Sequence, residues 1–188
     1  MKLIIVRHGQ TEENRRGIVQ GQKIGHLSEL GKQQVLNVAL ELSKVNLDAI
    51  YSSDLKRCVD TVIPIAKYHK NTDVIYSKQL EEIKIGGFGL VPLWFPPQLA
   101  NSALNIAIRL NFKSPGGESW KSLKNRERIF LNDLYSTHQN ETVLIVSHGI
   151  SIRAMLDLLS SKSIAKKLIK KEVPNCSINY LEMNHKLN

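Results

Sequence analysis

Long apolar runs and cysteine clusters are missing from this sequence of 188 residues. No stretch approaches the roughly 18 consecutive apolar residues that cross a bilayer, and the charges beside the first apolar run argue against a cleaved leader. We therefore expect no membrane partner and a location in the cytoplasm. The only cysteines, Cys58 and Cys176, lack the spacing of a disulfide framework or of a metal site. We expect both to be reduced, structural thiols.

Aromatic residues are also scarce, at 6% of the chain, and no zinc or RNA-binding signature is present. The net charge of +9 therefore does not indicate a nucleic-acid partner. The basic residues are scattered, and their densest group, between Lys162 and Lys171, has apolar residues at helical spacing. That pattern is typical of an amphipathic helix with a solvated basic face. Small anionic molecules are the class of ligand that this charge favours.

What is present is the composition of an ordinary globular chain, with 42% hydrophobic and 23% charged residues. The length fits one domain with a sizeable core. Internal repeats, low-complexity tracts and linkers are not found. We therefore expect residues 1–188 to form a single domain.

Two apolar strands end in the same kind of polar group. Residues 3–6 are apolar and are followed by Arg7, His8 and Gly9, and the apolar run at 142–146 is followed by His148 and Gly149. Buried strands of this kind belong to parallel sheets, whose ligand sites lie at the carboxyl ends of the strands. We expect both histidines at the same rim.

Strand and helix patterns alternate along most of the chain. A helix capped by Ser28 is expected to run to about Val45, and a second, from about Asp54, is expected to bend or break at Pro64. Predicted strands at 48–51, 73–76 and 177–182 and helices at 118–138 and 150–159 complete the pattern. Right-handed crossovers then favour an α/β fold, a three-layer α/β/α sandwich around a mostly parallel sheet.

The stretch at about 83–117 interrupts this alternation. It combines glycines, an apolar run with Leu93, Trp94 and Phe95, and a predicted helix at 98–110. Insertions at the ligand rim of a sheet commonly form lids. Two interpretations stay open: the aromatic pair fills the core, or it belongs to an apolar lid that suits a hydrophobic leaving group.

The polar residues that follow the strands share one chemistry, that of phosphoryl transfer. They are Arg7, His8, Arg57, Glu82 and His148. Guanidinium groups match phosphate oxygens bidentately, and a helix that begins near Gly149 would add backbone donors. An unprotonated histidine could attack phosphorus to form a phosphohistidine. Glu82, beside a bound dianion, would keep its proton and donate it to the leaving oxygen.

These residues lie in a series of motifs that resembles the histidine phosphatase superfamily, in its phosphoglycerate mutase-like branch. The resemblance spans nearly the whole chain, in the order of the family. Its segments are Arg7-His8-Gly9-Gln10-Thr11, Asn14, Gln20-Gly21, Leu27-Ser28, Gly31, Gln34, Ser52-Ser53-Asp54-Leu55-Lys56-Arg57, Thr61, Leu80-Glu81-Glu82-Ile83, Pro115-Gly116-Gly117-Glu118-Ser119 and Val146-Ser147-His148-Gly149.

The resemblance implies a role for each matching residue. His8 would be the phosphorylated nucleophile and Glu82 the proton donor, with Glu81 as the alternative acid. Phosphoryl oxygens would be held by Arg7, Arg57 and His148, and the substrate side would be lined by Asn14, Gln20, Gly21 and Gly149. The family needs no metal, and we expect neither a metal nor a cofactor in this chain.

One departure bears on the reaction. Mutases of the branch carry a longer, polar insertion and usually Gly-x-Trp-Glu-Gly after the acid, where this chain has Gly86-Gly87-Phe88-Gly89-Leu90. We therefore expect a phosphomonoester hydrolase acting on a small phosphorylated metabolite, as a monomer or homodimer. A phosphoglycerate mutase, and a weakly catalytic module that binds phosphate or phosphoproteins, remain the alternatives.

Overall fold

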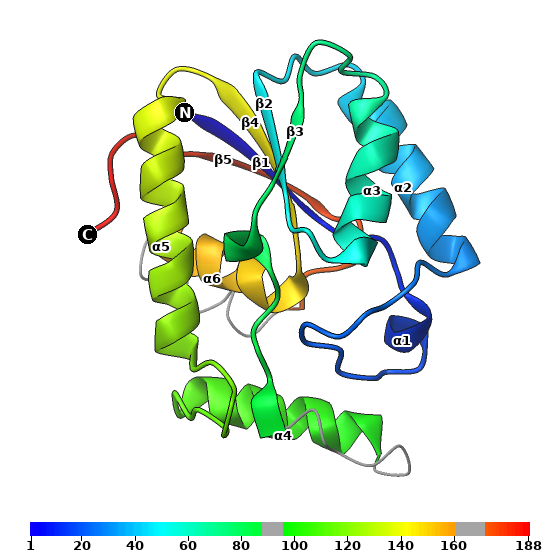
Figure 1. Ribbon diagram of the computed structural model, residues 1–188, viewed down its shortest axis with the longest axis vertical. Coiled ribbons are helices and arrows are strands. Elements are labelled where there is room, and N and C mark those ends of the chain that lie inside the picture. Colours follow the sequence, from blue (N-terminus) through cyan, green and yellow to red (C-terminus); the bar gives the residue numbers. More distant parts are fainter. Residues whose placement is uncertain (88–95, 161–171) are drawn as a thin grey trace.

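The computed structural model describes residues 1–87, 96–160 and 172–188 (Figure 1). Five strands form one sheet in the order β3-β2-β4-β1-β5. They are β1 (Lys2–Arg7), β2 (Ala49–Ser52), β3 (Val74–Tyr76), β4 (Thr142–Ser147) and β5 (Ile178–Glu182). All neighbouring pairs are parallel except β1 and β5. The predicted α/β fold around a mostly parallel sheet is confirmed.

Helices cover both faces of this sheet (Figure 1). The helices are α1 (Glu12–Arg15), α2 (Glu29–Leu42), α3 (Lys56–Ala66), α4 (Pro97–Arg109), α5 (Trp120–Thr137) and α6 (Gly149–Leu159), with a 3₁₀ helix at Lys78–Leu80. Side chains of α2 and α3 pack in one apolar cluster, and those of α5 and α6 in another. The strands lie between these two layers.

The alternation of β1 shows why the strand is apolar throughout. Leu3 and Ile5 belong to the cluster under α5 and α6, whereas Ile4 and Val6 belong to the cluster under α2 and α3. Successive side chains of a strand point to opposite faces, so a sheet covered on both faces needs apolar residues at every position. All four side chains are buried.

Two predicted helix ends need correction. Ser28 caps α2 as predicted, with its hydroxyl accepting from Gly31 N at 3.0 Å, but the helix ends at Leu42. Val45 lies beyond the end and packs against the cluster under α2 and α3. The expected break at Pro64 is wrong, because α3 continues to Ala66. Pro64 falls in the last turn of α3.

The insertion carries α4 and its own small core. Leu104 and Ile108 of α4 pack with Ile83, Leu123 and Ala154, among others. This contact ties α4 to the segment after the 3₁₀ helix, to α5 and to α6. The apolar residues Leu93, Trp94 and Phe95 lie outside the described residues, so neither interpretation of them is tested.

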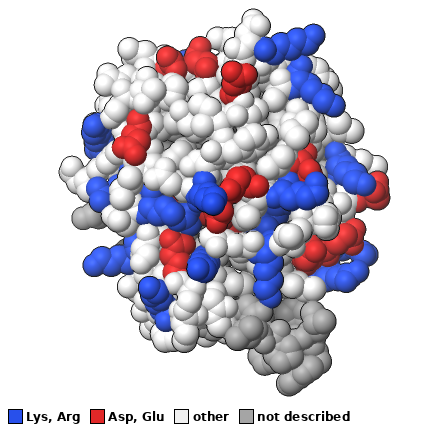
Figure 2. Space-filling model, in the orientation of Figure 1, with Lys and Arg blue, Asp and Glu red and all other residues white. Residues whose placement is uncertain are grey.

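The charges on the face in Figure 2 are dispersed, with Lys and Arg interleaved with Asp and Glu. The predicted basic helix at 162–171 lies outside the described residues. Within those residues, no helix combines the length and the apolarity needed to cross a membrane. Cys58 and Cys176 are both free, and burial raises the pKa of Cys176 to about 12.

Candidate active site

The register of the central strands brings the two histidines together. Arg7 at the end of β1 pairs with Ser147 at the end of β4, so the residues that follow, His8 and His148, leave the sheet side by side. Their ring centroids lie 5.2 Å apart. His8 is 3% exposed and faces the cavity described below, while His148 is fully buried behind it.

His8 is held as a neutral imidazole with a defined tautomer. Its Nδ1 lies 2.8 Å from the carbonyl oxygen of Gly9, which assigns the ring proton to Nδ1 and leaves the lone pair on Nε2. Burial, followed by the charges of Arg57 and Arg7, keeps the pKa of His8 well below its ordinary value of 6.5. The ring can therefore act as a nucleophile through Nε2.

Arg57, in the first turn of α3, is 2% exposed and bonded on all three nitrogens. Its Nε donates to His148 Nδ1 at 3.1 Å, and its Nη1 and Nη2 donate to the carbonyl oxygens of Lys23 and Gly21 at 2.9 and 2.7 Å. These bonds fix the guanidinium at the wall of the cavity. They also hold the 21–23 loop against the site.

His148 is bonded at both ring nitrogens. Nδ1 accepts from Arg57, and Nε2 lies 2.9 Å from Ser53 Oγ, so Nε2 carries the proton. Burial and the charge of Arg57 keep the pKa of His148 well below 6.5. In this arrangement His148 orients Arg57 from behind, and a bond from His148 to a phosphoryl oxygen would need one of these contacts to be exchanged.

Arg7 contributes the second guanidinium of the cavity wall. Its Nη1 donates to the carbonyl oxygen of Val173, and its Nε is buried without a partner among the described residues. Gly149 packs directly against it, because a Cβ at this position would lie 3.4 Å from Arg7 Cζ and Nε.

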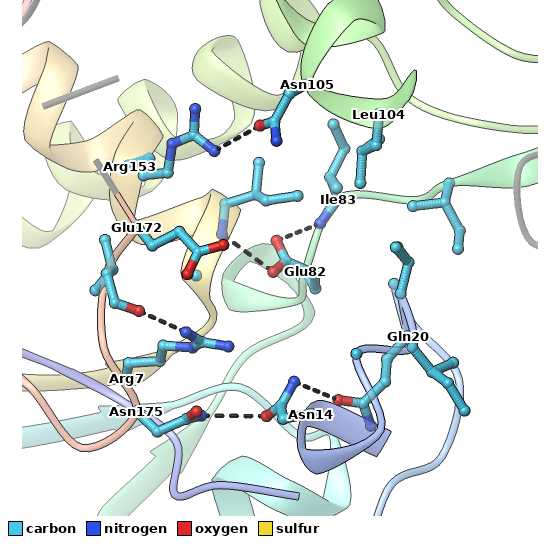
Figure 3. Close-up of a pocket in the computed structure, with 18 of the residues that line it drawn as sticks. Arg7, Asn14, Gln20, Glu82, Ile83, Leu104, Asn105, Arg153, Glu172 and Asn175 are labelled. Atoms are coloured by element: carbon cyan, nitrogen blue, oxygen red, sulfur yellow. Dashed lines mark hydrogen bonds between the residues drawn. The ribbon is translucent and has the colours of Figure 1, made fainter. Parts of the chain in front are cut away.

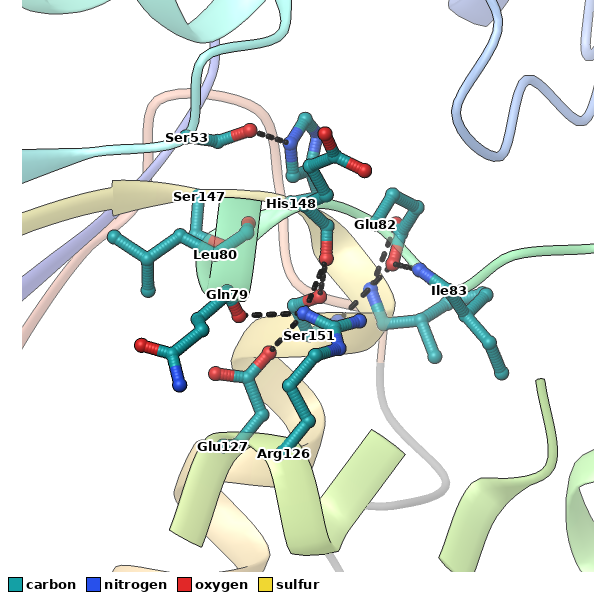
Figure 4. Close-up of polar contacts among 12 residues, drawn as sticks. Ser53, Gln79, Leu80, Glu82, Ile83, Arg126, Glu127, Ser147, His148 and Ser151 are labelled. Carbon is teal, nitrogen blue, oxygen red and sulfur yellow. Dashed lines mark hydrogen bonds and ion pairs between the residues drawn. The ribbon is translucent and has the colours of Figure 1, made fainter. Parts of the chain in front are cut away.

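Glu82 reaches the same cavity from the segment after the 3₁₀ helix. Its carboxylate oxygens accept from the backbone N–H groups of Ile83, Ile150 and Ser151 at 2.9 to 3.1 Å (Figure 4). Two of these donors belong to the first turn of α6. The sequence predicted that the N-terminus of this helix would offer its donors to phosphate, but Ile150 and Ser151 use theirs to bind Glu82.

A polar network behind Glu82 fixes the segment that carries it (Figure 4). Arg126 of α5 donates to the carbonyl oxygens of Gln79 and Glu81 and makes a bidentate pair with Glu118. Ser147 Oγ and Ser151 Oγ donate to the carbonyl oxygens of Leu80 and Glu81, each at 2.8 Å. The backbone of residues 79–81 is therefore held from β4, α5 and α6 at once.

Glu81, the alternative acid, is not part of the cavity wall. Burial, followed by the neighbouring Asp54, raises the pKa of its carboxyl. Of the two neighbouring carboxyls, Glu82 is the one that lines the cavity together with His8.

The remaining predicted residues form the wall on the side of α1. Asn14 Nδ2 donates to Gln20 Oε1 at 3.4 Å, and Asn14 Oδ1 accepts from Asn175 Nδ2 at 3.2 Å (Figure 3). Asn175 also donates to the carbonyl oxygen of His8 at 3.1 Å. Gly21 adopts φ = +53°, and a Cβ there would meet Ile85 at 2.7 Å. A glycine is required at this position for both reasons.

These walls enclose a cavity of about 670 Å³. Of the predicted site residues, all but the buried His148 line it. Several polar lining residues were not predicted from the sequence, namely Asn105, Arg109, Arg153, Glu172 and Asn175. Arg153 lies four residues after Gly149 on α6, a helical spacing that was available as a signal. Asn175 had no such signal, because its place depends on how β5 pairs with β1.

Among the residues described, no three His, Cys, Asp or Glu side chains cluster as metal ligands. The donors around the cavity are mainly guanidinium, amide and backbone N–H groups, which suit an anion and not a cation. That the reaction needs no metal stays a prediction.

Comparisons with known proteins agree with this chemistry. The chain matches the family model described as "Histidine phosphatase superfamily (branch 1)" over residues 3–188. It is 38% identical over 170 residues to phosphoserine phosphatase 1 of Hydrogenobacter thermophilus, a match that covers 88% of this chain and 79% of that protein. It is 32% identical over 189 residues to a metal-independent phosphoserine phosphatase of Arabidopsis thaliana, covering 97% and 76%.

Solved structures show the same fold. A mycobacterial glucosyl-3-phosphoglycerate phosphatase in complex with VO3 has a TM-score of 0.80 at 29% identity, over 96% of this chain and 92% of that one. The YhfR protein of Bacillus stearothermophilus has a TM-score of 0.84 at 23% identity, over 100% and 94%. At that identity the second likeness concerns the fold alone.

Proposed function

The chain belongs to branch 1 of the histidine phosphatase superfamily, and from this premise we propose that it hydrolyses a small phosphomonoester through a phosphohistidine formed at His8. The observation that carries the proposal is the state of His8. Its imidazole is neutral, has a free Nε2 and faces a cavity lined by Arg7, Arg57 and Glu82.

In the first step, His8 Nε2 attacks phosphorus and the bond from phosphorus to the leaving oxygen breaks. Arg7 and Arg57 stabilise the charge that is spread over the phosphoryl oxygens. Glu82 donates its proton to the leaving oxygen, which departs as an alcohol. The product of this step is phosphohistidine and a Glu82 carboxylate.

In the second step, the Glu82 carboxylate takes a proton from water as the water oxygen attacks phosphorus. The bond from phosphorus to Nε2 breaks, inorganic phosphate forms, and both residues return to their starting states. The three backbone donors at Glu82 hold its carboxyl in one place for both roles. No metal enters either step.

The test is release of inorganic phosphate from a panel of phosphomonoesters in the presence of a chelator. We expect His8→Ala to abolish it, a loss of at least about 10³-fold, while substitution of the exposed His185 to Ala preserves it. Wild type quenched in base should carry an acid-labile phosphoryl group that is missing from His8→Ala. Metal-dependent turnover, or full turnover by His8→Ala, would contradict the mechanism.

The same assay separates the two alternatives. A probable phosphoglycerate mutase, GpmB of Shigella dysenteriae, is 28% identical over 197 residues. A mutase would interconvert phosphoglycerates only after priming with a bisphosphorylated sugar acid, whereas a hydrolase releases phosphate without priming. Binding of phosphate without turnover in wild type would indicate a binding module.

Three further predictions belong to this proposal. We treat residues 1–188 as one domain, we expect the enzyme in the cytoplasm, and we expect a monomer or homodimer that contacts neither nucleic acid nor membrane. Light scattering on a sizing column measures the oligomeric state, and limited proteolysis that yields two stable fragments would contradict the single domain.

A further inference from the structure

Amide side chains on the α1 side of the cavity form a chain of hydrogen bonds (Figure 3). Asn175 Nδ2 donates to Asn14 Oδ1 at 3.2 Å, and Asn14 Nδ2 donates to Gln20 Oε1 at 3.4 Å. Gln20 Nε2 in turn donates to Glu13 Oε2 at 3.2 Å. The three amides line the cavity, whereas Glu13 does not. The chain therefore connects the wall of the site to a carboxylate outside it.

Glu13 permits one orientation of the Gln20 amide. A carboxylate accepts hydrogen bonds and donates none, so the NH2 group of Gln20 must face it. Gln20 Oε1 then points the other way, where it accepts from Thr11 Oγ1 at 3.0 Å as well as from Asn14 Nδ2. A reversed Gln20 would lose these bonds and would present an oxygen to Glu13.

The orientation of Gln20 matters because of the group that Asn14 offers to the cavity. Asn14 Oδ1 accepts from Thr11 N at 3.3 Å and from Asn175, so its NH2 group faces Gln20. One N–H binds Gln20 Oε1, and the other has no partner among the described residues. That second N–H is available to a phosphoryl oxygen. A reversed Gln20 would bring two NH2 groups together and displace the Asn14 amide.

The charge of Glu13 has the opposite effect on an anion. Burial lowers the pKa of Arg57, and Glu13 is among the groups whose negative charge opposes that shift. Glu13 is therefore within electrostatic range of the cavity, and its charge alone would weaken the binding of phosphate. Removal of this carboxylate should tighten phosphate binding if only its charge matters, and should weaken binding if its hydrogen bond to Gln20 matters more.

We propose that Glu13 is a positioning residue that orients the Gln20 amide, so that Asn14 presents an N–H to the phosphoryl group. The proposal rests on the proposed function, because it requires phosphoryl oxygens to bind beside His8 and Asn14. A hydrogen bond from Asn14 forms in the bound substrate and in the transition state alike. Its loss should therefore raise KM and leave kcat nearly unchanged.

Gly25 allows the same amide to be displaced without a change of charge. A Cβ at Gly25 would overlap Gln20 Nε2 and lie 3.0 Å from Glu13 Oε2. The φ of Gly25 is not positive, so an alanine there brings no left-handed backbone strain. Gly25→Ala should move the Gln20 amide away from Glu13 and leave the carboxylate in place.

Two measurements on the full chain test the proposal. Calorimetric titration with inorganic phosphate gives Kd and the binding-competent fraction together, and hydrolysis of p-nitrophenyl phosphate gives KM and kcat. We expect Glu13→Ala to raise Kd and KM by about tenfold, the lower end of what a hydrogen bond to a charged group contributes, with kcat within about twofold of wild type. Gly25→Ala should have the same effect. Glu13→Gln keeps an accepting oxygen and should recover most of the loss.

Matched controls exist for both kinds of variant. Glu12 lies one residue before Glu13 and pairs with Arg15 at 2.9 Å on the surface. Glu12→Ala removes the same charge from α1 without touching Gln20, so it should not raise Kd or KM. Gly87→Ala, whose Cβ would lie no closer than 3.8 Å to its nearest neighbour, should match wild type.

The outcomes separate this role from the function on which it rests. Unchanged or tighter phosphate binding by Glu13→Ala would overturn the positioning role while phosphatase activity stands. Equal losses in Glu13→Gln and Glu13→Ala, or a fall in kcat at constant KM, would overturn it as well. If wild type neither binds phosphate nor releases it from any phosphomonoester, the proposed function fails, and the positioning role fails with it.

Discussion

His8 and His148 are chemically the same and are used differently by their surroundings. A single bond to the carbonyl oxygen of Gly9 leaves His8 with a free Nε2, whereas His148 uses one nitrogen for Arg57 and the other for Ser53. Burial and nearby guanidinium charges lower the pKa of both. In the proposed mechanism the first ring is the nucleophile, and the second holds the guanidinium of Arg57 in place.

Arg126 affects the proposed reaction indirectly, by positioning Glu82. Its bonds to the carbonyl oxygens of Gln79 and Glu81 fix the backbone that carries Glu82. We expect Arg126→Gln to lower kcat by about 10- to 100-fold, because small displacements of a proton donor are costly, with little change in KM. Steady-state kinetics measures this split.

The conservative variant provides the control for this role. Arg126→Lys should recover part of kcat, and Arg128→Gln, two residues along the same helix, should match wild type. An increase in KM without a fall in kcat would show that Arg126 does not position the proton donor.

At the scale of elements, hydrogen bonds join the two ends of the insertion, residues 84–87 and 114–118; we call this pair of segments the clamp. Gly87 N donates to the carbonyl oxygen of Pro115 at 3.0 Å, and Glu118 N donates to that of Lys84 at 2.7 Å. Ser114 Oγ binds the carbonyl oxygen of Ile85 at 2.7 Å. The segment after Glu82 is thus hydrogen-bonded to the segment before α5, so the two chain segments that lead into and out of α4 are held together.

Gly86 is the residue on which this clamp depends. Its φ is +51°, and a Cβ would meet Gly117 N and the carbonyl oxygen of Pro115 at 2.4 Å. Gly116 has φ = +68° with nothing within 4 Å of a Cβ. We expect Gly116→Ala to cost about 1 kcal/mol of unfolding free energy and Gly86→Ala more than about 3 kcal/mol, because strain and overlap add. Urea unfolding measures both.

The difference between the unfolding free energies of Gly86→Ala and Gly116→Ala tests this explanation. If both lose the same stability, left-handed backbone strain alone explains the effect and the close approach at Gly86 contributes nothing.

At the scale of the molecule, the buried histidines link stability to pH. Their folded pKa values lie below the ordinary value of 6.5. Below pH 6.5 the unfolded chain therefore binds protons that the folded chain does not, and folded stability falls as the pH falls. Each histidine contributes up to about 1.4 kcal/mol per pH unit in this window. The buried Glu127, whose pKa burial raises well above 4.5, acts in the opposite sense above that pH.

The contribution of one histidine can be isolated by difference. Between pH 7 and pH 5.5, His8→Asn should lose about 1 kcal/mol less unfolding free energy than wild type, because its side chain takes up no proton. Gly116→Ala should shift the whole curve and keep the wild-type dependence on pH. Equal dependence in wild type and His8→Asn would mean that His8 is protonated in the folded state.

The sequence by itself determined the layout of this protein. The apolar strands predicted a sheet buried on both faces, the cap at Ser28 predicted the start of α2, and the residues after β1 and β4 predicted two histidines at one rim. These are local signals or follow from the rule that parallel strands share an edge. The resemblance to a known family added Asn14, Gln20 and Gly21, whose part in the site no local pattern shows.

Only the tertiary structure decided the bonding of the site. The partners of His148 are Arg57 of α3 and Ser53, which follows β2. Two donors to Glu82 come from α6, and Arg126 reaches the backbone of residues 79–81 from α5. Asn175 and Glu172 join the cavity because β5 pairs with β1 at the far end of the chain. Periodicity reports which face of an element is buried, but it does not report which distant side chain meets that face. Hydrogen-bond partners and histidine tautomers depend on these long-range contacts, so only the packed structure determines them.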